Sequence, residues 1–121
     1  MIAHGLPKRP NRERVAEAWA RGGMPIPRVS VRVAYGVEML AGSAYIVGFL
    51  TGWDSLILVA FMLVVTWWSI RVSRERLVSH GTKGYDVNLA LLAIFLTTAL
   101  AGGGAYSLDA VLGLAPYWPV R

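Results

Sequence analysis

The sequence contains no cysteine among its 121 residues, which excludes disulfides, thiol redox chemistry, thiolate metal ligands and cysteine nucleophiles. It is also poor in charge, because Asp, Glu, Lys and Arg make up only 16% of it. An average soluble domain carries about 25% charged residues. Residues of the AVILMFWYC set reach 55%. This composition excludes a disordered chain and predicts one small membrane domain rather than a soluble one.

Histidine is scarce as well, and the two present, His4 and His80, lie outside the long apolar stretches. Neither has a second metal ligand at a useful spacing, so we expect no metal or haem site. The sequence has no glycine-rich phosphate loop and no nucleophile elbow. The motifs therefore predict no catalytic activity for this chain by itself.

Three apolar stretches dominate what is present, at residues 33–52, 54–70 and 87–105. A transmembrane helix needs about 20 residues, within a range of about 17–25. The first and third stretches have this length, and the second lies at the short end. The predicted fold is all-α, an antiparallel bundle of three transmembrane helices.

Turn and capping residues separate these stretches. Gly52-Trp53-Asp54 predicts a tight hairpin, with Asp54 as the N-cap of the second helix. Asp86 can cap the third helix, which should end at Gly102-Gly103-Gly104 because glycine opposes continuation of a helix. Ser107 is then a suitable N-cap for a short helix at the outer interface.

The positive charges are distributed unevenly. Residues 1–32 hold seven Lys and Arg, residues 71–86 hold four, the 51–54 hairpin holds none, and the remaining one is Arg121. By the positive-inside rule the N-terminus is cytoplasmic and the C-terminus lies outside. The length of the basic region also argues against a signal peptide. We attribute the net charge of +5 to this orientation and expect no nucleic-acid partner.

The basic arm, residues 1–32, contains a predicted short amphipathic helix over residues 12–21. It can lie on anionic headgroups, where each near-surface Lys or Arg contributes about 1 kcal/mol, or it can contact a partner subunit. Both readings remain open. The residues expected to make either contact are Arg12, Arg14, Trp19, Arg21 and Arg28.

Glu38 lies five residues into the first apolar stretch, at a depth of about 7.5 Å for a helical rise of 1.5 Å per residue. An ionisable group at that depth is costly unless it is paired, hydrated or protonated. A structural ion pair or hydrogen bond would satisfy it. Alternatively, Glu38 carries proton- or quinone-linked chemistry.

Small residues recur along the same stretch, at Gly36, Gly42, Gly48 and Gly52. Small side chains let two membrane helices approach closely. These glycines therefore predict a helix-packing surface rather than a lipid-facing one.

Two segments resemble the DoxX family of small bacterial and archaeal membrane proteins, which includes the DoxD subunit of thiosulfate:quinone oxidoreductase. Gly36-Val37-Glu38-Met39-Leu40-Ala41-Gly42 is similar to the family's Glu- and Gly-bearing helix. Gly104-Ala105-Tyr106-Ser107-Leu108-Asp109 is similar to its glycine-rich stretch before Ser-Leu-Asp. The resemblance covers about residues 33–113, the expected membrane domain, which is followed by an outer tail at residues 114–121.

The resemblance implies a multi-pass protein of a prokaryotic plasma (inner) membrane that acts as an accessory subunit of a quinone-linked redox complex. It places Glu38, Tyr45 and Asp109 near a quinone or proton path, with any quinone bound in the complex and no cofactor bound by this chain alone. Family members typically have four membrane helices, and this chain lacks the first. We therefore expect larger membrane subunits or a second copy, besides lipid, as partners. The alternative is a small proton-coupled transporter that uses Glu38.

Overall fold

The structure is a computed structural model that describes residue 2 and residues 10–78 and 84–114. Its described residues form helices and turns and contain no β-strand, so the predicted all-α class is confirmed. Parts of the basic arm and residues 115–121, nearly all of the predicted outer tail, lie outside the described residues.

The chain divides into two compact units, Met1–Ser43 and Ala44–Arg121. The first contains α2 (Arg12–Arg21) and most of α3 (Pro27–Val47). The second contains the end of α3, then α4 (Thr51–Arg71), α5 (Asp86–Ala101) and the short α6 (Leu108–Val111).

Helix α3 does not have the bounds expected from the apolar stretch 33–52. It begins earlier, at Pro27, because proline has its backbone angle preset for the first position of a helix. It also ends earlier, at Val47, because Gly48 turns the backbone to a φ of +69°. The extra turns at its start carry Arg28 and Arg32, both exposed.

The hairpin between α3 and α4 consists of Gly48, Phe49 and Leu50, so its prediction at residues 52–54 was wrong. Leu50 is the N-cap residue of α4 and has a left-handed φ of +47°. Asp54 lies inside the first turn of α4 and is not the cap. Sequence reasoning placed the turn at the polar residue, whereas the chain turns at the preceding glycine.

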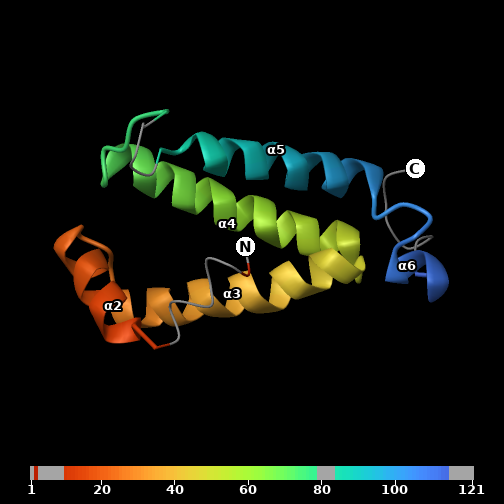
Figure 1. The fold of residues 1–121 in the computed structure, drawn as a ribbon, viewed down its shortest axis with the longest axis horizontal. Helices are drawn as coiled ribbons and strands as arrows, with labels where there is room; N and C mark the ends of the chain where they lie inside the picture. Colours follow the sequence, from red (N-terminus) through yellow and green to blue (C-terminus); the bar gives the residue numbers. More distant parts are fainter. Residues whose placement is uncertain (1, 3–9, 79–83, 115–121) are drawn as a thin grey trace. The chain divides into compact units, whose positions relative to one another are not determined.

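Helices α4 and α5 pack along each other and run in opposite directions (Figure 1). Helix α5 ends at Ala101 because Gly102 adopts a φ of +77°, which confirms the predicted stop at the glycine run. At the start of α5, Tyr85 occupies the N-cap position and Asp86 is the first helical residue, so Asp86 is not the cap. Ser107 caps α6, as predicted, by accepting the N–H of Ala110.

The buried face of α4 is polar, and its exposed face is apolar. Thr51, Asp54, Ser55, Thr66 and Ser69 are buried together with Leu58 and Met62. The exposed large side chains of this helix are Trp53, Leu56, Ile57, Leu63, Val64, Trp67 and Ile70. Water would favour the opposite arrangement, whereas hydrocarbon favours this one.

Within the described residues, α4 is the one helix that is both long and apolar enough to cross a membrane. Only 33% of its most apolar stretch is buried, whereas the core helix of a soluble protein is mostly buried. Helix α5 is also apolar but has 16 residues, fewer than the length usual for a span. By length, composition and exposure, α4 is therefore a candidate membrane helix.

Candidate functional site at the α3–α4 hairpin

The carboxylate of Asp109 caps α4 although it lies far away in the sequence. The N–H groups of Leu50 and Thr51 donate to its two oxygens at 2.6 and 2.7 Å. Helix α6 thus lies at the end of the α4–α5 pair where α4 begins (Figure 1). A carboxylate at this position satisfies N–H groups that have no partner within the helix and interacts favourably with the helix dipole.

Asp109 also donates a hydrogen bond to the hairpin. The N–H of Asp109 donates to the carbonyl of Gly48 at 2.9 Å, so α6 binds the hairpin through a donor as well as an acceptor. A Cβ added at Gly48 would lie 2.6 Å from Cβ of Ser107. Only glycine combines this close approach with the left-handed φ. We call these contacts of Asp109 with Gly48, Leu50 and Thr51 the hairpin latch.

Ser107 positions the latch. Its hydroxyl donates to the carbonyl of Gly104 at 2.7 Å and accepts the N–H of Ala110 at 3.2 Å. Gly103 leaves room beside it, because a Cβ there would lie 2.6 Å from Oγ1 of Thr51 and 2.8 Å from Cβ of Ser107. The segment Gly104–Asp109 singled out in the sequence thus has a structural explanation: it presents Asp109 to the start of α4.

Tyr45 bridges the end of α3 to α5. Its ring meets Phe95 edge to face, with centroids 5.0 Å apart and an interplanar angle of 82°. Its hydroxyl lies 2.6 Å from Oγ1 of Thr98. Because the Thr98 hydroxyl donates to the carbonyl of Ile94, we assign Tyr45 as the donor. Tyr45 thereby holds α3 to α5 by both a ring contact and a hydrogen bond.

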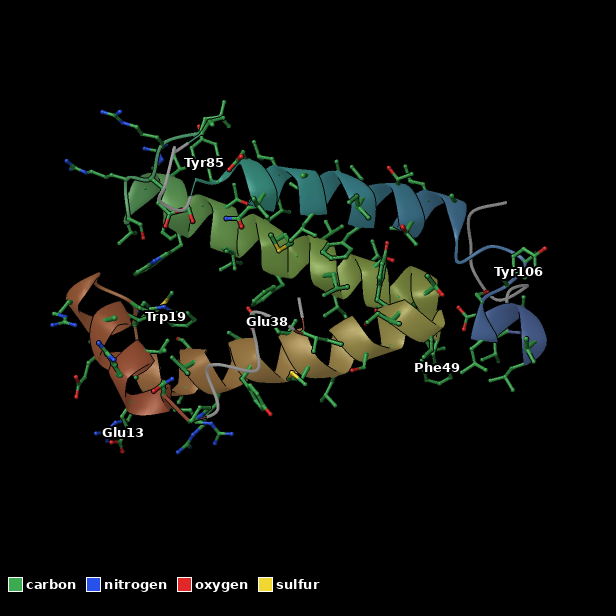
Figure 2. The ribbon with its side chains drawn as sticks, in the orientation of Figure 1. Glu13, Trp19, Glu38, Phe49, Tyr85 and Tyr106 are labelled. Carbon is green, nitrogen blue, oxygen red and sulfur yellow. The ribbon has the colours of Figure 1, made fainter. Side chains whose placement is uncertain are left out.

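Glu38 lies on the buried face of α3, which it shares with Val31, Ala34 and Ala41 at helical spacing. The residue is only 6% exposed, so the expectation that Glu38 is not lipid-facing is consistent with its burial. Figure 2 labels it on α3. Glu38 belongs to the first unit, whereas Tyr45 and Asp109 belong to the second.

The four glycines expected to form a packing surface occupy different environments. Gly42 is buried on α3, while a Cβ added at Gly36 would meet nothing within 4 Å. Gly48 is in the hairpin and Gly52 is in α4, so these two do not share a helix. The spacing Gly48–Gly52 therefore reflects a turn rather than a helix-packing motif.

Helix α2 has the predicted position, with Asn11 at its N-cap position. Ala16 is buried and Trp19 is half-buried. The guanidinium of Arg12 lies over the ring of Tyr35, 5.2 Å from its centroid, which connects the start of α2 to α3. The other arginines of the expected contact surface, Arg14, Arg21 and Arg28, are exposed.

Sequence reasoning missed the buried oxygens in the first turn of α4. Asp54 was interpreted as a cap, and neither Thr51 nor Ser55 was singled out, yet all three residues are buried. The available signal was an acidic residue at the edge of an apolar stretch. The described residues contain no group of three or more His, Cys, Asp or Glu side chains that could hold a metal ion.

Comparison with known proteins gives a match to a protein family. No curated protein and no solved structure matches this chain. The DoxX family model matches residues 1–71, which is more than half of the chain and includes the basic arm, α3 and α4. Gly104–Asp109 lies beyond the matched stretch, so the hairpin latch rests on the structure alone. The family match and the apolar α4, whose large side chains are mostly exposed, together indicate a small membrane protein. The chain belongs to the DoxX family.

Proposed function

We propose that the chain is an accessory subunit of a quinone-linked membrane redox complex and that it packs against and stabilises larger subunits. The observation that carries this proposal is that the polar groups of Tyr45 and Asp109 are occupied by contacts within the chain. Both were candidates for chemistry, and both are engaged in contacts that hold helices together. Their hydrogen-bonding groups serve the architecture of the chain.

A quinone fits these two residues poorly. Quinone carbonyls accept hydrogen bonds, but the Tyr45 hydroxyl already has Thr98 as a partner and the Asp109 carboxylate is itself an acceptor of two backbone N–H groups. We therefore assign no step of quinone chemistry to this chain. In this proposal the quinone is bound by the larger subunits.

The proposed topology has three membrane spans, formed by α3, α4 and α5, with the N-terminus in the cytoplasm of a prokaryote. Arg71, Arg74 and Arg76 are exposed just beyond the end of α4, while the hairpin at the other end contains no Lys or Arg. This asymmetry supports the orientation through the positive-inside rule. Tyr85 and Tyr106, at opposite ends of the α4–α5 pair in Figure 2, fit aromatic belts at the two interfaces.

The absence of native cysteine makes this topology directly testable. Phe49→Cys places one thiol in the hairpin, and Ser73→Cys places one beyond α4, both at exposed positions. A membrane-impermeant maleimide should label Phe49→Cys in intact cells and Ser73→Cys only after permeabilisation. Labelling of Ser73→Cys in intact cells would overturn the orientation.

The accessory role itself is tested by purification in mild detergent, followed by mass spectrometry of co-purifying chains and a visible spectrum. Larger subunits carrying haem or flavin are the expected result. A colourless assembly of this chain alone would contradict it. The role of the basic arm is tested by removing residues 1–28. The shortened chain should dissociate from its partner subunits if the arm binds a partner. It should bind the membrane surface more weakly if the arm binds lipid.

The burial of Glu38 favours one alternative, a small proton-coupled transporter. Ionisable side chains buried in membrane helices commonly mark proton relays. Glu38→Gln should then abolish proton-coupled transport by the reconstituted protein while leaving assembly intact. If the chain is instead an accessory subunit, Glu38→Gln should leave the turnover of the complex unchanged.

A further inference from the structure

The first turn of α4 contains a sealed polar cluster formed by Thr51, Asp54 and Ser55. Their exposed fractions are 3%, 6% and 0%. They are spaced i, i+3 and i+4, which places them on one face of the helix as near neighbours. This polar cluster is at the hairpin end of α4, beside the latch.

The latch does not use the polar cluster's side chains. The carboxylate of Asp109 accepts hydrogen bonds from the N–H groups of Leu50 and Thr51, so α4 does not need the carboxyl group of Asp54 as a cap. Oδ2 of Asp54, Oγ of Ser55 and Oγ1 of Thr51 are buried without a hydrogen-bond partner. Buried polar groups normally have partners, and an exception calls for an explanation such as a function or a bound species.

No positive charge is available from the neighbouring segments. Residues 44–70 and 84–114 contain no Lys or Arg. The titratable groups that the second unit brings to this end are the carboxylate of Asp109 on α6 and the hydroxyl of Tyr45 on α3, which is bonded to Thr98. Tyr106 is fully exposed. An ionised Asp54 would therefore be a buried anion without a Lys or Arg from these segments to pair with.

The two carboxyl groups have different hydrogen-bonding surroundings. The oxygens of Asp109 accept the N–H groups of Leu50 and Thr51. Oδ2 of Asp54 has no hydrogen-bond partner. Burial without a hydrogen-bond partner or a cation favours the neutral, protonated form of a carboxyl group.

We propose that Asp54 is a proton-binding site, held as a neutral carboxylic acid in the polar cluster with the hydroxyls of Thr51 and Ser55. A proton fits this cluster without additional space, unlike a hydrated cation. Leu58 and Met62, 0% and 2% exposed, fill the next positions of the same face. The next buried hydroxyl, that of Thr66, is about 18 Å from Asp54 along α4 at a rise of about 1.5 Å per residue.

This proposal is tested by nuclear magnetic resonance on the full chain in detergent micelles, with aspartate labelled by carbon-13 at the side-chain carboxyl. The chain contains only three aspartates, Asp54, Asp86 and Asp109, so three titrating signals are expected. One signal should retain the shift of a protonated acid at neutral pH. That signal should disappear in Asp54→Asn and persist in Asp86→Asn.

The proposal is overturned if the Asp54 signal has the shift of an ionised carboxylate at neutral pH. If Asp54→Asn does not fold, the assignment follows by elimination from Asp86→Asn and Asp109→Asn, so the protonation state is still determined. A further expectation is that Asp54→Asn keeps the thermal stability of the parent protein at neutral pH, because an amide resembles a neutral acid. This outcome does not depend on any partner subunit, so it stands or falls separately from the proposed function.

Discussion

The two ends of the α4–α5 pair are held in different ways. At the hairpin end, buried acidic and hydroxyl groups meet backbone N–H groups, and the segment contains no Lys or Arg. At the other end, Arg71, Arg74 and Arg76 are exposed, and among the described residues there the N–H of Tyr85 donates to the carbonyl of Arg76. The contacts at the hairpin end fix the position of α6 against the start of α4, whereas the loop end exposes positive charge.

The largest loss of stability is expected for Asp109→Ala. The change leaves the N–H groups of Leu50 and Thr51 without their charged acceptor, at a cost of about 3 kcal/mol in the free energy of unfolding. Unfolding by SDS in mixed micelles measures this cost. Asp86→Ala, at the loop end, is the matched control, and an equal effect of the two variants would remove the distinction between the ends.

Gly48→Ala should have the next largest effect. It combines a left-handed φ of +69° with a Cβ placed 2.6 Å from Cβ of Ser107. Gly113 has the same φ and open space around its Cβ, so Gly113→Ala isolates the cost of backbone strain. We expect about 1 kcal/mol for Gly113→Ala and at least about twice that for Gly48→Ala, by the same unfolding measurement. Equal losses would show that the contact with Ser107 does not matter.

Tyr45→Phe should cost about 1 kcal/mol. It removes the hydrogen bond to Thr98 and keeps the ring contact with Phe95. Tyr106→Phe is the control, since that side chain is fully exposed and should change the free energy of unfolding very little. A loss for Tyr45→Phe no greater than that for Tyr106→Phe would contradict a structural role for the Tyr45 hydroxyl.

The smallest effect on stability is expected at the loop end. Replacing Arg71, Arg74 and Arg76 together by Gln should change the free energy of unfolding by less than about 0.5 kcal/mol per residue, because exposed charges contribute little. The same unfolding measurement checks it. A loss as large as that of Asp109→Ala would show that the arginines are structural.

Several local features were predictable because they depend on neighbouring residues. The end of α5 at Gly102 follows from the conformational freedom of glycine, and Ser107 caps α6 through its own hydroxyl. The hairpin was misplaced because Asp54 has the chemistry of a cap. The α4 cap is supplied instead by Asp109, whose approach depends on α6 folding back against the hairpin.

The sequence by itself determined the helical class, the apolar character of α4 and the family, since these depend on composition, local spacing and the pattern of residues along the chain. Only the tertiary structure decided which acid caps α4, which hydroxyl Tyr45 meets, and which face of α4 is buried. The physical reason is that a cap or a hydrogen bond needs two groups at contact distance. For Asp109 and Thr51, that proximity is created by the fold and not by their spacing along the chain.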